Sequence, residues 1–238
     1  MWLYAEIKTL ADIPRHYART QPKKVALIDP LGARTFAELD RASNRLANAI
    51  LACGIEPGSH IGFLGKNSAR YFETLFAAGK AGCALAPINW RLSEAELQLV
   101  IDDAKCPLIL VDKEFSASLA GVRAGCATSV RCVQFDSTSS EPQELDELLQ
   151  HVSDGDPHRP LAPEATAVLM YTSGTTGKPK GVMLSHQGFS YMRLCEHLEP
   201  ALRWHPDDVM LMAMPNFHLV GTGLSVQSLY NGSTVSIL

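Results

Sequence analysis

The segment YTSGTTGKPKG, residues 171–181, is rich in groups that can bind an anion. Glycine lacks a Cβ atom, so its backbone can adopt positive φ and a ligand can approach closely. Successive backbone N–H groups that point into one concavity hold anions, and nearby hydroxyls and lysines add donors and positive charge. The segment therefore predicts a polyphosphate site made of Thr172, Ser173, Gly174, Thr175, Thr176, Gly177, Lys178 and Lys180.

Two common phosphate-binding motifs, the Walker A loop and G-x-G-x-x-G, do not match this segment. A Walker A loop needs G-x-x-x-x-G-K-[ST] at the start of a helix, whereas only two residues separate Gly174 from Gly177. Lys178 is followed by Pro179, which restricts the loop, and the pattern after Gly181 is that of a strand. The alternative interpretation from these residues alone is a mobile surface hairpin whose lysines serve solubility.

Short apolar runs typical of strands alternate along the chain with longer amphipathic runs typical of helices. Strands are expected at residues 25–30, 60–64, 84–89, 107–112, 129–135, 165–173, 181–185, 208–215 and 233–238. Helices are expected at residues 10–20, 35–53, 68–82, 95–104, 142–152, 185–197 and 219–230. This alternation predicts an α/β fold of mostly parallel sheets flanked by helices. Ligands in such folds bind at the carboxyl ends of strands, where the glycine-rich segment also lies.

Local signals fix several of these boundaries. Thr35 with Glu38, and Ser93 with Glu96, have the spacing of a capping box at a helix start. Gly54 suits the residue just after a helix end. Residues 153–164 contain three prolines and several charges, which predicts a loop or linker and a candidate internal boundary.

Composition narrows the class of protein. The 238 residues are 46% hydrophobic and carry a net charge of −4, with no Lys/Arg-rich tract, so a nucleic-acid partner is not expected. No apolar run approaches the roughly 18 residues of a membrane span, and charges at Glu6, Lys8 and Asp12 come too early for a signal peptide. The six cysteines form no C-x-x-C pair and are expected to be buried, reduced thiols, which favours a cytoplasmic protein. The composition does not decide whether the protein contacts a membrane surface peripherally.

The longer stretch YTSGTTGKPKGVMLSH closely resembles the signature of the adenylate-forming enzymes, which include acyl-CoA synthetases, luciferases and peptide-synthetase adenylation domains. Three further segments resemble the same family and extend the resemblance over essentially the whole chain: RTFAELDRASNRLANAI, GKAGCALAPINWRLSEAEL and AMPNFHLVGTGL. The last two look closest to a fatty-acid–CoA ligase and its acyl- and aryl-CoA relatives.

The resemblance implies a two-step reaction that uses ATP, Mg²⁺ and coenzyme A. A carboxylic acid, a fatty acid in the favoured interpretation, becomes an acyl-adenylate and is then transferred to the coenzyme A thiol. The resemblance implies that Thr172 to Lys180 hold the β- and γ-phosphates. It implies that His218 lies at the entrance of the acyl pocket, with Phe217, Val220 and Gly221 beside it. Without the resemblance, the favoured interpretation of His218 is a loop histidine bonded to backbone.

Other polar residues are weaker candidates. His186 follows a predicted N-cap, which favours capping or packing, and Asp102 and Asp103 suit a solvated helix end. Residues 89–91 are expected to make structural bonds. The eight histidines show no metal-binding spacing, so no metal ligand and no certain catalytic residue is expected in this chain.

Segments that the resemblance assigns to adenine, ribose and magnesium binding are absent, as are the mobile C-terminal domain and its lysine. We therefore expect the chain to be the N-terminal part of the large domain of such an enzyme, inactive by itself. Residues 1–53 and about 200–238 are expected to form one α/β subdomain, and 54–199 the other, with the phosphate loop at 171–181. Two alternatives remain: an adenylation domain that loads a carrier-protein thiol, or a non-catalytic nucleotide-binding fragment. The acyl chain length stays open, and the sequence is compatible with a homo-oligomer.

Overall fold

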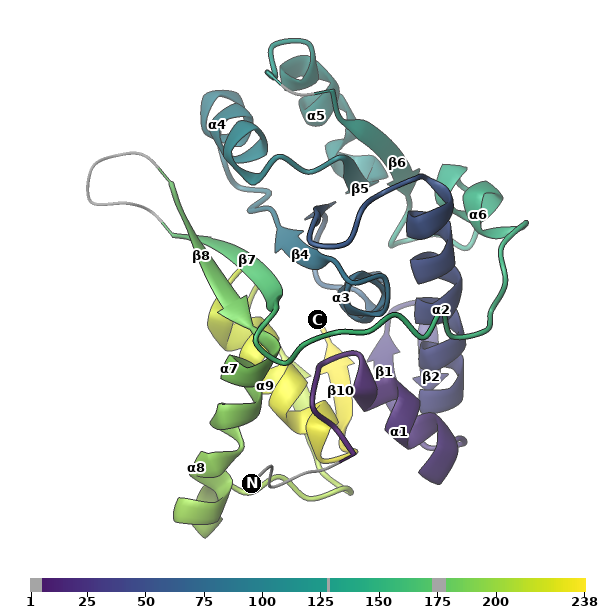
Figure 1. The fold of residues 1–238 in the computed structure, drawn as a ribbon, viewed down its shortest axis with the longest axis vertical. Coiled ribbons are helices and arrows are strands. Elements are labelled where there is room, and N and C mark those ends of the chain that lie inside the picture. The colour runs from purple at the N-terminus through teal and green to yellow at the C-terminus, as the bar shows by residue number, and fades with distance from the viewer. Residues whose placement is uncertain (1–5, 128, 173–178) are drawn as a thin grey trace.

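The structure, a computed structural model, describes residues 6–127, 129–172 and 179–238. A six-stranded sheet forms its centre, with the strand order β6-β5-β3-β4-β7-β8 (Figure 1). Its strands are β3 (His60–Leu64), β4 (Ala84–Pro87), β5 (Leu108–Asp112), β6 (Arg131–Phe135), β7 (Thr166–Thr172) and β8 (Lys180–Ser185). All neighbouring pairs are parallel except β7 and β8, which form an antiparallel edge.

A second, four-stranded sheet has the order β2-β1-β10-β9 and joins early and late parts of the sequence. Its strands are β1 (Val25–Asp29), β2 (Gly32–Thr35), β9 (Val209–Met212) and β10 (Thr234–Ile237). β1 is parallel to β10, and β10 is parallel to β9, whereas β2 is antiparallel to β1. The predicted α/β fold with mostly parallel sheets is therefore confirmed. The division into subdomains stays a prediction.

Helices flank both sheets, and most of them begin where the sequence signals predict. They are α1 (Asp12–Thr20), α2 (Phe36–Ala52), α3 (Ala69–Lys80), α4 (Glu94–Ala104), α5 (Ser116–Arg123), α6 (Glu144–Leu149), α7 (His186–Met192), α8 (Leu194–Leu198) and α9 (Leu219–Tyr230). Both predicted capping boxes are present, at the starts of α2 and α4. The prediction of one helix over 185–197 is wrong, because α7 and α8 meet at Arg193 as two short helices.

The side chains of β5 show how the layers are arranged. Leu108 and Leu110 face the larger core, which contains α2, α3 and the inner face of the four-stranded sheet. Ile109 and Val111 point the other way, into a smaller core with α4 and α5. Because successive strand residues alternate between faces, a strand that is apolar throughout must be covered on both sides. The six-stranded sheet is thus sandwiched between helices.

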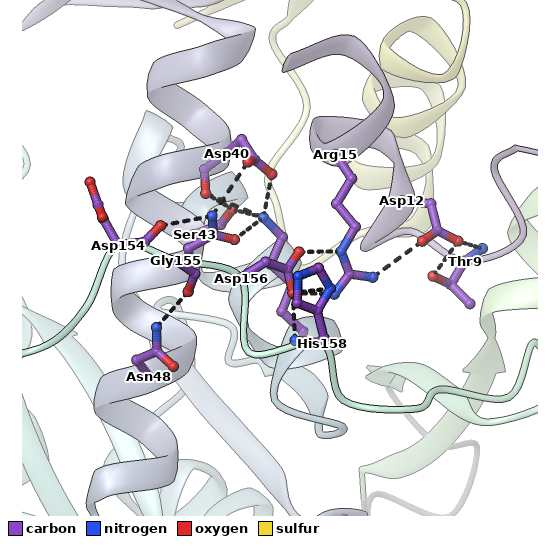
Figure 2. A network of polar contacts seen from close by, with 12 residues as sticks. Thr9, Asp12, Arg15, Asp40, Ser43, Asn48, Asp154, Gly155, Asp156 and His158 are labelled. Carbon is purple, nitrogen blue, oxygen red and sulfur yellow. Dashed lines mark hydrogen bonds and ion pairs between the residues drawn. The ribbon is translucent and has the colours of Figure 1, made fainter. Parts of the chain in front are cut away.

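Residues 153–164, predicted as a linker, have neither helix nor strand, yet they are held firmly to α1 and α2. Arg15 forms two bonds with Asp156, of 2.5 and 2.9 Å, and Asn48 donates to the carbonyl oxygen of Gly155 (Figure 2). Asn48 also donates to the carbonyl oxygen of Ser153. This anchored segment leads directly into β7. Hydrogen bonds from side chains hold this segment in place, where a strand would be held by backbone hydrogen bonds to its neighbour.

A buried lysine lies beside the same segment. The Lys80 ammonium, at the end of α3, bonds to the Asp40 carboxylate at 2.6 Å, to Ser43 Oγ at 2.8 Å and to Asn44 Oδ1 at 2.6 Å. The side chain of Lys80 is fully buried, and this burial lowers its pKa, while Asp40 acts in the opposite direction. These acceptors provide the pairing that a buried charge needs.

The thiols are only partly as predicted. All six cysteines are free, but only Cys83 and Cys106 are buried, and Cys195 is exposed. Burial raises the pKa of Cys83 to about 11 and that of Cys106 to about 12. Within the described ranges, no helix has both the length and the apolar character that crossing a membrane requires.

Candidate functional site

The antiparallel ladder of β7 and β8 forms the base of the glycine-rich loop. Thr172 lies opposite Lys180 in the last pair of this ladder, and both residues are exposed. The predicted residues Ser173, Gly174, Thr175, Thr176, Gly177 and Lys178 lie outside the described residues. Among the predicted phosphate-binding residues, the structure therefore places Thr172 and Lys180 together, at the carboxyl end of β7.

The pair before it, Tyr171 and Gly181, explains why a glycine follows Lys180. A Cβ atom on Gly181 would lie 2.9 Å from Leu169 Cδ1 and 3.3 Å from the Tyr171 ring. The Tyr171 hydroxyl donates a hydrogen bond of 2.6 Å to Asp103 Oδ2 at the end of α4. Burial and the Asp103 carboxylate both raise the pKa of Tyr171, which keeps the hydroxyl protonated as a donor.

Asp103 is exposed, as expected for a solvated helix end, but both Asp102 and Asp103 also accept hydrogen bonds. Asp103 holds the strand that enters the glycine-rich loop, and Asp102 accepts a hydrogen bond of 2.8 Å from the Ala127 N–H. Tyr171 was not singled out as a positioning residue. Its partner is 68 positions away in the sequence, so no local pattern reveals the contact.

The second group of predicted residues lies in the loop after β9, which holds Phe217 and His218, and in the first turn of α9, which holds Val220 and Gly221. Phe217 is buried, whereas His218 and Val220 are exposed at the start of α9. Gly221 is buried where the helix crosses its own incoming loop. A Cβ atom there would lie 2.4 Å from the Pro215 carbonyl oxygen, closer than any real contact. Gly221 thus allows the helix to approach the loop that presents His218.

An aromatic cluster, which consists of Trp90, Phe115 and Phe217, joins this loop to the six-stranded sheet. The Trp90 ring stacks on Phe115 at 5.9 Å between centroids and meets Phe217 edge-on at 6.1 Å. The Arg91 guanidinium lies 4.6 Å from the centroid of Trp90, and the Lys66 ammonium lies 5.7 Å from it. Cations over an indole face are attracted by its negative potential.

The aromatic cluster gathers loops from several strand ends. Lys66 follows β3, Arg91 and Trp90 follow β4, Phe115 follows β5, and Phe217 follows β9. β4 is also the neighbour of β7, with Leu85 opposite Val168. The two predicted groups, on the glycine-rich loop and at His218, therefore both lie at carboxyl ends of parallel strands. That is the edge at which α/β sheets bind ligands.

His186 is buried in the packing of the structure, which is one of the two roles, capping or packing, predicted for it. The cap of α7 is Ser185, whose side chain accepts a hydrogen bond of 3.0 Å from the Gly188 N–H. The His186 Nδ1 atom accepts a hydrogen bond of 3.1 Å from the Leu10 N–H. Burial lowers the pKa of His186 to about 4, so the ring is neutral. Across the described ranges, no three His, Cys, Asp or Glu side chains gather in a way that could hold a metal ion.

Comparison with known proteins gives a family match over residues 14–238, to the family described as AMP-binding enzyme. A fatty acid–[acyl-carrier-protein] ligase, ScoC, of Streptomyces coeruleorubidus is 31% identical over 98% of this chain and 44% of its own length. A feruloyl-CoA synthase of an Amycolatopsis species is 34% identical over 95% of this chain and 43% of its own length. The chain thus spans less than half the length of these relatives.

Solved structures share the fold. A Mycobacterium tuberculosis fatty acyl CoA synthetase superposes with a TM-score of 0.86 at 23% identity, over 99% of this chain and 45% of that one. The N-terminal domain of FACL13 from the same organism superposes with a TM-score of 0.84 at 23% identity, over 98% of this chain and 57% of the domain. At this level of identity the likeness shows the fold alone.

Proposed function

The chain belongs to the AMP-binding enzyme family, and from this premise we propose that it forms the phosphate-binding and acid-binding part of an enzyme that activates a carboxylic acid with ATP. An oxygen of the carboxylate attacks the α-phosphorus of ATP. The bond from that phosphorus to the oxygen of the β-phosphate breaks, and pyrophosphate leaves. The sulfur of a thiol then attacks the acyl carbonyl carbon, loses its proton, and displaces AMP.

One observation carries this proposal: Thr172 lies opposite Lys180 at the mouth of the glycine-rich loop, at the carboxyl end of a parallel strand. In the proposal, these two residues and the loop residues between them hold the β- and γ-phosphates. Negative charge grows on pyrophosphate as it leaves. Fixed hydroxyls, N–H groups and the lysine charges stabilise that charge without having to reorganise.

The acid binds, in this proposal, near His218, with Phe217, Val220 and Gly221 around it. The exposed imidazole lies at the start of α9, with its ring centroid 4.6 Å from that of Phe217, and this exposed position supports a polar contact to a carboxylate. A fatty acid is the favoured substrate and coenzyme A the favoured thiol. No magnesium ligand is proposed, since the described residues supply no suitable cluster, and no step is assigned to a metal.

Paired variants of the full-length enzyme test the two halves of the proposal separately. Thr175→Ala combined with Lys178→Ala should slow ATP–pyrophosphate exchange more than it alters the preference among acids. His218→Ala should raise the KM for the acid and leave the KM for ATP close to that of wild type. Lys23→Ala removes an exposed lysine ahead of β1 and serves as the charge control. Unchanged exchange in the double variant contradicts the phosphate role, and a defect confined to ATP affinity contradicts the role of His218.

The alternative acceptor is a carrier-protein thiol, which the name of the ScoC relative favours. Comparing coenzyme A with a phosphopantetheinyl carrier as acceptor in the full-length enzyme separates these two.

The other alternative is a non-catalytic nucleotide-binding module. We expect the 238-residue chain to bind ATP and pyrophosphate in a calorimetric titration but to catalyse no acid-dependent ATP–pyrophosphate exchange. Exchange by the chain alone overturns that expectation.

A further inference from the structure

We propose that Asn67 and Asn216 are positioning residues that fix the loop carrying Phe217 and His218 to the carboxyl end of β3. This inference rests on the role proposed for His218. It concerns how the imidazole is held rather than what it binds. The two asparagines, called here the asparagine clamp, are 149 positions apart in the sequence and come from loops of the two different sheets.

The asparagine clamp is reciprocal. Asn67 Oδ1 accepts a hydrogen bond of 2.9 Å from the Asn216 N–H, and Asn67 Nδ2 donates to the Met214 carbonyl oxygen at 3.1 Å. In the other direction, Asn216 Nδ2 donates to the carbonyl oxygens of Gly65 and Lys66, at 3.0 Å each. Each loop therefore both gives and receives side-chain bonds, so neither can shift along the other without breaking several.

The far side of the same loop is held from α9 and α3. Thr222 Oγ1 donates to the Asn216 carbonyl oxygen at 2.7 Å and also bonds to the Tyr71 hydroxyl at 2.6 Å. Tyr71 and Thr222 are fully buried, and Asn216 is 1% exposed. Hydrogen bonds at such depth are protected from competition with water, and leaving a buried partner unmade costs about 1–3 kcal/mol.

Asn216 is used at this position for its donors. Its Oδ1 atom is buried and has no hydrogen-bond partner among the described residues, whereas its Nδ2 serves two carbonyl groups at once. The next residue, Phe217, packs edge-on against Trp90. The clamp and the aromatic cluster thus meet at adjacent positions, and the His218 ring follows at 4.6 Å from the Phe217 ring. Small displacements of a reacting group are costly, which makes such anchoring functional.

Isosteric substitution gives the sharpest test, with a control of the same chemistry. Asn216→Asp keeps the side-chain shape but turns a nitrogen that donates twice into an oxygen facing two carbonyl oxygens. Asn67→Asp keeps the acceptor for the Asn216 N–H but puts an oxygen in place of Nδ2, which donates to the carbonyl oxygens of Met214 at 3.1 Å and Met212 at 3.5 Å. Asn48→Asp is the control, because Asn48 Nδ2 likewise donates to two carbonyl oxygens, at 2.8 Å each, on the anchored segment 153–164.

The readout on the 238-residue chain is the ring signal of His218 in NMR spectra of ¹³C-histidine-labelled protein, identified with His218→Gln. Asn216→Asp and Asn67→Asp should both shift this signal and speed amide exchange over residues 216–222, while Asn48→Asp leaves the signal at its wild-type position. If Asn216→Asp does not fold, Asn67→Asp decides. A wild-type His218 signal in the clamp variants, or an equal shift in Asn48→Asp, overturns the proposal.

A second readout separates positioning from general damage. In the full-length enzyme, the clamp variants should lower kcat/KM for the acid about tenfold or more while the KM for ATP changes by less than about twofold. Equal losses for both substrates, or a matching loss in Asn48→Asp, contradict the inference. If the wild-type enzyme shows no ATP–pyrophosphate exchange at all, the proposed function fails, and the ring-signal experiment still decides whether the clamp exists.

Discussion

The Tyr171 hydroxyl donates a 2.6 Å hydrogen bond to Asp103 Oδ2, which ties the end of β7 to the end of α4. Tyr171 stands two positions before the first residue of the glycine-rich loop that lies outside the described ranges. The contact therefore fixes one of the two strands from which the proposed phosphate-binding loop emerges.

Tyr171→Phe removes this bond and leaves the ring in place. We expect a loss of about 1 kcal/mol in the free energy of unfolding, because a hydrogen bond to a carboxylate is strong but this one is partly exposed. Urea unfolding gives the loss. Tyr191→Phe, which alters a tyrosine that is 54% exposed, is the control and should change stability by less. Equal stability of the Tyr171 and Tyr191 variants contradicts a holding role for Asp103.

Gly221→Ala and Gly223→Ala form a matched pair on α9. Both substitutions gain helix propensity of about 1 kcal/mol. At Gly223 the new methyl group meets the flexible end of Met192 at 3.2 Å and Leu219 Cδ1 at an ordinary contact distance of 3.5 Å, so we expect a neutral or stabilising effect. At Gly221 it meets the Pro215 carbonyl oxygen at 2.4 Å, and we expect a net loss of roughly 1–3 kcal/mol. Thermal unfolding compares the two, and equal melting temperatures contradict the close approach.

His186 makes stability depend on pH. Its folded-state pKa of about 4 lies below the ordinary value of 6.5, mainly because of burial and despite the nearby Asp12 carboxylate. Above pH 6.5 the ring is neutral in both states, so its contribution is fully present. As the pH falls from 6.5 towards 4, the His186 ring becomes protonated in the unfolded chain but stays neutral in the folded chain. The free energy of unfolding therefore decreases over this range.

The expected loss from His186 is about 2 kcal/mol at pH 5 relative to pH 7.5, by proton linkage. Urea unfolding at the two pH values measures the difference. His186→Gln retains an acceptor for the Leu10 N–H but does not titrate, so its stability should fall by about that much less over the same range. An identical pH dependence in the variant and the wild type rules out His186 as the source.

Lys80→Met tests the buried ammonium. The substitution leaves the Asp40 carboxylate, Ser43 and Asn44 without their shared donor. Removing one partner of a buried ion pair typically costs about 3–5 kcal/mol, whereas an exposed pair contributes about 0–1 kcal/mol. Lys113→Met is the control, because the Lys113 side chain, which pairs with Asp136 at 3.4 Å, is 60% exposed. Similar losses in the free energy of unfolding for both variants, measured with urea, would contradict a large stabilising role for the buried Lys80 ammonium.

Much of the fold could be predicted because its signals are local. Thr35 and Glu38 mark a helix start through contacts three residues apart, and the structure contains that capping box. The run Leu108–Val111 is apolar throughout and lies in a strand buried on both faces. The split at Arg193 was missed because the residues on either side carry no strong helix-ending signal such as Gly or Pro.

The sequence by itself determined three things about this protein: the glycine-rich segment, the alternation of strands and helices, and the family resemblance. Each rests on propensity, capping or motif spacing, which act over a few neighbouring residues. The tertiary structure alone decided which side chains meet: Asn67 with Asn216, Trp90 with Phe217, and Tyr171 with Asp103. These contacts depend on strand order and on the carboxyl ends that the order brings together. Contacts between residues that are tens to hundreds of positions apart produce no pattern in the local sequence around either residue, so they cannot be predicted from it.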